Sequence, residues 1–110
     1  MLPVSVPSVA ANQVADGARV LDVREADEWQ AGHIEGALHI PLAEVPTRLD
    51  DLVGADELVV VCRSGGRSAR AVAWLVRNGL DAVNLEGGMG AWAAAGRPMI
   101  SELGTEPFVR

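Results

Sequence analysis

Leu58-Val-Val-Val61 runs directly into Cys62-Arg-Ser-Gly-Gly-Arg67-Ser68, and this junction indicates how the whole chain is built. A continuous, mostly β-branched apolar run is typical of a parallel strand covered on both faces. The glycine-containing loop leads into residues 68–78, which have a helical pattern and end at Gly79. The segment therefore predicts a strand, a loop and a helix in succession. The apolar stripe expected on the helix is Ala69, Val72, Ala73 and Val76.

Strands and helices are predicted to alternate on both sides of this junction. Further strands are expected at residues 4–6, 20–23, 37–40 and 82–85. Helices are expected at residues 7–15, 25–31, 42–53 and 86–95. Pro46 is expected to divide the third of these into two short helices. The alternation predicts an α/β fold with a mostly parallel sheet. Residues 99–110 show no strong pattern and are expected to form a loosely attached tail.

Length and composition set further bounds. The chain has 110 residues, 49% of them hydrophobic and 22% charged, which is ordinary for one globular domain spanning residues 1–110. No apolar run is long enough to span a membrane, and the first residues do not resemble a signal peptide, so a cytoplasmic location is expected. The single cysteine excludes an internal disulfide framework and a metal site built from several cysteines.

Charge is unevenly divided along the chain. Residues 1–59 carry 11 acidic residues and 3 arginines, a balance of −8, whereas residues 60–110 carry 4 acidic residues and 6 arginines, a balance of +2. The acidic half disfavours nucleic acid as a partner. The arginines nearest to Cys62 are Arg63, Arg67 and Arg70.

Cys62 stands where chemistry is expected in such a fold. Open α/β sheets bind ligands at the carboxyl ends of their strands, and a helix start offers unpaired N–H groups. Gly65 and Gly66 allow the loop amides to curl around an anion. Such surroundings lower a thiol pKa from ~8.5 to between roughly 3.5 and 7.5, which makes the cysteine nucleophilic. The alternative is a buried cysteine that only packs, but two glycines, two arginines and a helix start favour the reactive one.

Three motifs in order resemble the rhodanese-like sulfurtransferase family. The first comprises Leu21-Asp-Val-Arg24, Glu28-Trp29, Gly32-His-Ile-Glu-Gly-Ala37 and Ile40-Pro41. The second is Cys62-Arg-Ser-Gly-Gly-Arg-Ser68, which resembles the active-site loop of that family. The third is Leu85-Glu-Gly-Gly-Met-Gly-Ala-Trp92 with Gly96-Arg-Pro98. The match covers a core of about residues 4–98.

The resemblance implies a rhodanese-like fold, a five-stranded mostly parallel sheet flanked by helices on both faces. It implies an enzyme of the single-domain branch that carries sulfane sulfur as a persulfide of Cys62. In that reaction Cys62 takes sulfur from thiosulfate or a persulfide and passes it to cyanide, a thiol or a protein. No cofactor and no metal is expected.

The other loop residues receive roles on the same basis. The amides of residues 63–67, including Ser64, Gly65 and Gly66, are expected to hold the persulfide. Arg67 is expected to bind the anionic end of the sulfur donor. Arg63 either assists or is a solvated charge, and Ser68 either hydrogen-bonds the loop or caps the helix. The resemblance places Asp22 and Arg24 in a supporting network with Glu28.

Two other functions are weighed against sulfur transfer. A persulfide carrier or protein-interaction module with little small-molecule turnover would keep the same loop. A phosphatase or arsenate reductase is disfavoured because four residues separate Cys62 from Arg67, whereas cysteine-dependent phosphatases have five at this position. The shorter loop suits a single sulfur atom rather than a tetrahedral phosphate.

Overall fold

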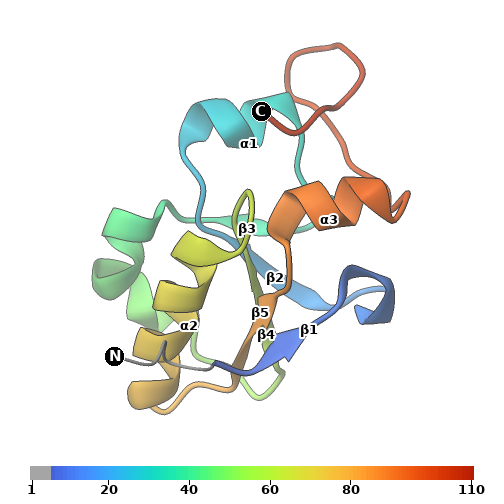
Figure 1. The fold of residues 1–110 in the computed structure, drawn as a ribbon. Coiled ribbons are helices and arrows are strands. Elements are labelled where there is room, and N and C mark those ends of the chain that lie inside the picture. Colours follow the sequence, from blue (N-terminus) through green and yellow to red (C-terminus); the bar gives the residue numbers. More distant parts are fainter. Residues whose placement is uncertain (1–5) are drawn as a thin grey trace.

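The computed structural model describes residues 6–110. They form one sheet of five parallel strands, with helices on both faces. The strand order is β1-β5-β4-β2-β3 (Figure 1). The strands are β1 (Ser8–Val9), β2 (Arg19–Asp22), β3 (Leu38–His39), β4 (Leu58–Val61) and β5 (Ala82–Leu85). Every pairing between them is parallel, which confirms the predicted α/β fold. β4 lies at the centre, and all four of its residues are buried, as its apolar run predicts.

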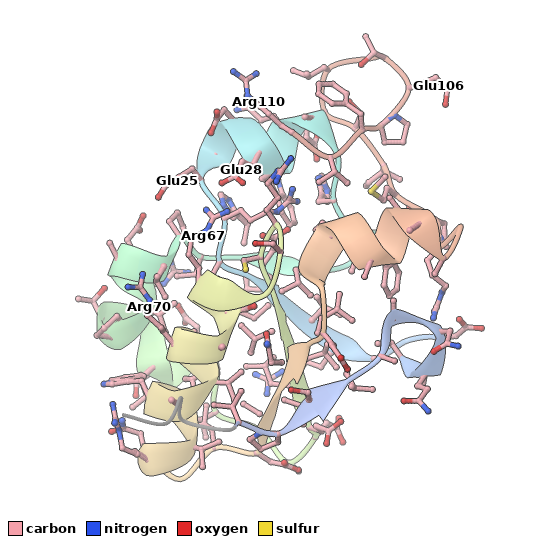
Figure 2. All side chains as sticks on the ribbon, viewed as in Figure 1. Glu25, Glu28, Arg67, Arg70, Glu106 and Arg110 are labelled. Atoms are coloured by element: carbon pink, nitrogen blue, oxygen red, sulfur yellow. The ribbon has the colours of Figure 1, made fainter. Side chains whose placement is uncertain are left out.

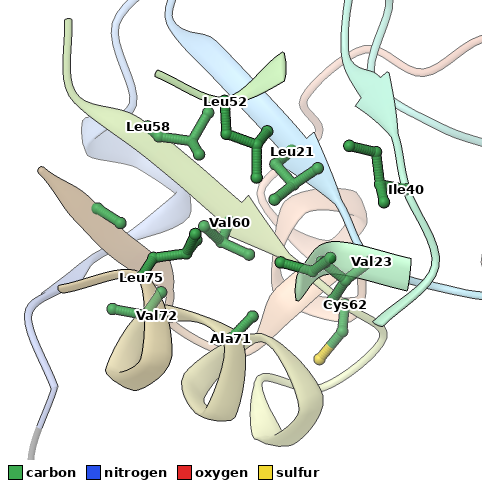
Figure 3. Packing of buried hydrophobic residues seen from close by; sticks show 12 residues of the cluster. Leu21, Val23, Ile40, Leu52, Leu58, Val60, Cys62, Ala71, Val72 and Leu75 are labelled. Carbon is green, nitrogen blue, oxygen red and sulfur yellow. The ribbon is translucent and has the colours of Figure 1, made fainter. Parts of the chain in front are cut away.

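The sheet divides the core into two layers, each covered by helices. The helices are η1 (Ala11–Gln13), α1 (Ala26–Ala31), η2 (Leu42–Asp51), α2 (Gly66–Arg77) and α3 (Gly88–Ala94). Leu58, Val60 and Cys62 face α2 and η2, whereas Val59 and Val61 face η1 and α3. This alternation along β4 places the Cys62 side chain on the α2 face of the sheet (Figure 3).

The N-terminal segment differs from the prediction. The helix expected over residues 7–15 is wrong, because this stretch forms β1 and the short 3₁₀-helix η1. Asn84 N–H donates to Pro7 O at 2.8 Å and Glu86 N–H to Val9 O at 2.9 Å. The backbone therefore pairs with the outer edge of β5, which would otherwise carry unpaired polar groups. Of the strand expected at residues 4–6, Val6 is not in a strand and the other two lie outside the described residues.

Two helices also differ in detail. η2 is interrupted at Arg48 (φ −117°, ψ 20°) rather than at Pro46, which lies inside the helix. In α2 the buried positions are Ser68, Ala71, Val72 and Leu75, so the predicted stripe is displaced and Val76 is exposed. Across residues 6–110 no helix is long and apolar enough to cross a membrane.

The segment over residues 99–110 is not a loosely attached tail. His33 and Ile100 exchange two backbone hydrogen bonds of 2.9 Å, and Phe108 N–H donates to Ala31 O at 3.0 Å. Met99 and Val109 pack against the core layer under α3. The segment is therefore part of the domain, and it returns along α1 towards the carboxyl end of the sheet (Figure 1).

Candidate active site

Cys62 lies between the last residue of β4 and the first turn of α2, at the carboxyl edge of the sheet. The loop turns at Gly65, whose φ of +109° is in the left-handed region that favours glycine. Gly66 then begins α2. The sequence thus predicts this strand-loop-helix junction correctly. Figure 3 shows the sulfur directed towards α2.

The N-terminus of α3 donates hydrogen bonds to the carbonyl groups of this loop. Met89 N–H donates to Cys62 O at 2.8 Å, and Gly90 N–H donates to Arg63 O at 3.0 Å. A Cβ atom at Gly88 would overlap Cys62 O and the Arg63 carbonyl group, so this close approach requires glycine. Because α3 binds these carbonyl groups from behind, the following amides are free to turn towards the sulfur. This contact explains Gly88, the second of the two glycines that follow Glu86.

The sulfur atom receives several hydrogen bonds. Gly65 N–H lies 3.1 Å from Sγ of Cys62, and Oγ of Ser68 lies 3.2 Å from it. Burial raises the pKa of the Cys62 thiol, but hydrogen bonds from the Ser68 hydroxyl and from the backbone of Ser68, Gly65 and Ser64 outweigh it. The net result is a lowered thiol pKa. Cys62 is only 1% exposed, so the loop surrounds a single sulfur atom closely.

Arg67 forms a bidentate ion pair with Glu28 from α1. Nη1 and Nη2 of Arg67 lie 2.7 and 2.9 Å from the two carboxylate oxygens. Glu28 occupies the third position of α1, where it also forms a capping box with Glu25. Mainly through the hydrogen bond from Arg67, the pKa of Glu28 falls from 4.5 to about 2, so the carboxylate is charged at neutral pH. Figure 2 shows the two side chains facing each other between α1 and α2.

Asp22 and Arg24 form a second, fully buried ion pair at the end of β2. Nη2 of Arg24 lies 2.8 Å from the Asp22 carboxylate and 2.7 Å from Gly32 O, and its Nε also donates to Asp22. The positive charge of Arg24 contributes to the low pKa of Glu28, although no hydrogen bond joins the two. Through Gly32 O, Arg24 joins the residues before α1 to the residue after it, and this contact sets the position of α1 and hence of Glu28.

Arg63 contacts the C-terminal segment. Its Nε donates to the backbone oxygen of Arg110 at 3.1 Å. Nε of Arg110 in turn lies 3.1 Å from the Asp27 carboxylate on α1. Residues 108–110 thus border the active-site loop on the α1 side, a placement that no signal in the sequence indicates.

Asn84 is the site residue that sequence reasoning missed. It lies on β5, is 7% exposed, and accepts a hydrogen bond from Ser68 while donating one to Gly65 O. An amide side chain within the apolar run Ala82-Val-Asn-Leu85 is the signal that marks it.

Each of the two histidines is held by a backbone carbonyl group and by Trp29. Nδ1 of His33 is 2.8 Å from Trp29 O, Nε2 of His39 is 2.7 Å from Arg24 O, and both rings stack on Trp29. Within residues 6–110, no three His, Cys, Asp or Glu side chains are grouped in a way that could hold a metal ion.

Comparison with known proteins assigns the chain to a family. The model of the rhodanese-like domain matches residues 6–95. A rhodanese-related protein from Thermoplasma volcanium superposes with a TM-score of 0.81 at 34% identity, covering 86% of this chain and 97% of that one. The protein is a member of the rhodanese-like domain family.

Curated relatives are similar over most of this chain. A protein of Allochromatium vinosum named sulfurtransferase is 38% identical over 95 residues, which is 84% of this chain and 89% of that protein. A putative sulfur carrier protein of Bacillus subtilis is 40% identical over 78 residues, which is 70% of this chain but only 42% of the carrier. These names support a role in rhodanese-type sulfur transfer.

Proposed function

We propose that the protein is a sulfurtransferase that carries sulfane sulfur on Cys62. The observation behind this proposal is the set of hydrogen bonds from Gly65 and Ser68 to one nearly enclosed sulfur atom. These hydrogen bonds stabilise the Cys62 thiolate, the form that attacks a sulfur donor. The family and the names of the relatives support the same reaction class.

The reaction is a double displacement. The Cys62 thiolate attacks the outer sulfur of thiosulfate, a new S–S bond forms, and the bond to the sulfonate sulfur breaks as its electron pair leaves with sulfite. Cyanide or an external thiolate then attacks the outer sulfur of the persulfide, and the electron pair of that S–S bond returns to Sγ. Because the sequence has one cysteine, an external acceptor must complete the cycle.

The second candidate is a persulfide carrier that exchanges sulfur with one protein partner. It is favoured by the 1% exposure of Cys62 and by the engagement of Arg67 with Glu28, which leave little access for a free anion. Turnover separates the two. The proposed enzyme forms many thiocyanate molecules per protein from thiosulfate and cyanide, whereas a carrier loaded with sulfur discharges one and stops.

The Arg67–Glu28 pair makes a specific prediction about thiosulfate. If the sulfonate group replaces Glu28 on the guanidinium, Arg67→Ala is expected to raise KM for thiosulfate about tenfold or more, the cost of one charge-assisted contact. Glu28→Gln keeps the side-chain size but frees Arg67, so KM for thiosulfate is expected to fall. Steady-state kinetics with thiosulfate and with a neutral organic persulfide measure both. Equal losses with the two sulfur donors in Arg67→Ala would show that Arg67 only shapes the loop.

A further inference from the structure

The hydroxyl of Ser68 has two acceptors and one proton. Its Oγ lies 3.2 Å from Sγ of Cys62 and 2.5 Å from Oδ1 of Asn84. All three residues are buried, with Cys62 1%, Ser68 0% and Asn84 7% exposed. A hydroxyl donates one hydrogen bond at a time, so Cys62 and Asn84 compete for it.

The orientation of Asn84 follows from its other contact. Its Nδ2 donates to Gly65 O at 3.2 Å, which leaves Oδ1 facing Ser68. Turning the amide over would place Oδ1 against the Gly65 carbonyl oxygen, with no proton between them. A separation of 2.5 Å from Oγ also suits an O–H···O bond better than one from an amide nitrogen. Asn84 is therefore an acceptor for Ser68.

The competition links the hydrogen bonding of Asn84 to the protonation of Cys62. In the thiol form, S–H donates to Oγ of Ser68 and the hydroxyl donates to Asn84. In the thiolate form, the hydroxyl turns to Sγ, and Oδ1 of Asn84 loses its only hydrogen-bond donor among the described residues. A buried acceptor left without a donor is costly, so the Ser68–Asn84 bond opposes ionisation.

We propose that Asn84 is a positioning residue that restrains ionisation of Cys62 by holding the Ser68 hydroxyl. This inference rests on the proposed function only in taking the thiolate as the attacking form. In the persulfide the negative charge lies on the outer sulfur, so the Ser68 hydroxyl returns to Asn84. Asn84 therefore favours both the thiol and the persulfide over the free thiolate.

The variants that test this proposal leave the other charged groups near the loop unchanged. These groups comprise Arg63 and Arg67 on the loop and α2, Glu28 on α1, the Asp22–Arg24 pair on β2 and Glu86 after β5. Their field is common to all variants, so differences in the pH profile report changes in the hydrogen bonds to Sγ of Cys62.

The test is the pH dependence of iodoacetamide alkylation of Cys62 in the full chain, which reads the thiolate directly. Ser68→Ala removes a hydrogen bond to the thiolate, so alkylation below the titration midpoint is expected to be about tenfold slower. Asn84→Ala releases the hydroxyl to Sγ, so alkylation is expected to be several-fold faster. The double variant should match Ser68→Ala, because Asn84 has no hydroxyl left to hold.

A purely structural role for Asn84 gives the opposite result. If Asn84 only anchors Gly65 O, its loss would loosen the Gly65 N–H bond to Sγ and slow alkylation, and the effect would persist in the double variant. Slower or unchanged alkylation in Asn84→Ala therefore overturns the proposal. Asn84→Val, whose β-branched side chain suits a buried strand, is the second variant should Asn84→Ala fail to fold. Val83→Ala, on the opposite face of β5, is the control and should leave the profile unchanged. Alkylation requires no sulfur donor, so the result stands apart from whether the protein transfers sulfur.

Discussion

Cys62→Ser is expected to lower thiosulfate:cyanide sulfur transfer by at least about a thousandfold, as removal of a catalytic nucleophile does in other enzymes. Serine fits the site and accepts the same hydrogen bonds from Gly65 and Ser68, but its oxygen cannot form a persulfide. No other thiol in the sequence can replace it. Thiocyanate formation under saturating substrates measures the loss, and an unchanged unfolding midpoint shows that the fold is intact. A variant that keeps most of the activity would contradict the covalent mechanism.

Arg24→Met is expected to cause the largest loss of stability, about 3–5 kcal/mol. The change leaves the Asp22 carboxylate, 1% exposed, without its guanidinium partner in the interior. Methionine replaces only the apolar stem of the arginine, and Gly32 O loses its hydrogen bond as well. Urea unfolding followed by circular dichroism measures the free energy of unfolding.

The exposed pair of Arg48 and Asp51 is the matched control for that experiment. Both side chains are exposed, by 41% and 51%, so Arg48→Met is expected to change stability by less than about 1 kcal/mol. If Arg24→Met lowers the free energy of unfolding no more than Arg48→Met does, the Asp22–Arg24 pair does not stabilise the position of α1.

The centre of the site was predictable because its determinants are local. The apolar run of β4 is buried on both faces, and the strand-loop-helix order puts Cys62 beside a helix start whatever the rest of the chain does. Gly65 is needed for a positive φ that few other residues adopt. Arg67 lies in the first turn of α2 next to the loop, but its ion pair with Glu28 was not predicted, and its role in binding the sulfur donor stays a prediction.

The unpredicted parts depend on which segments become neighbours. Asn84 reaches Ser68 only because β5 pairs with β4, and the strand order cannot be read from residue patterns. Residues 7–15 were predicted to form a helix, but residues 8 and 9 instead pair with the edge of β5 as strand β1. Phe108 is attached through backbone hydrogen bonding, which leaves no mark on composition. In α2 the buried stripe runs through Ala71 and Leu75 rather than through Ala73 and Val76, so the face of the helix that packs on the sheet is rotated from the predicted one.

The most direct test of the central claim is the intact mass of the protein after incubation with a sulfur donor and desalting. Thiosulfate is expected to add the mass of one sulfur atom, which peptide mapping places on Cys62 and which cyanide removes. The Cys62→Ser variant is expected to gain nothing. A protein that gains no sulfur from either thiosulfate or an organic persulfide, or that gains it in the Cys62→Ser variant, would contradict a Cys62 persulfide.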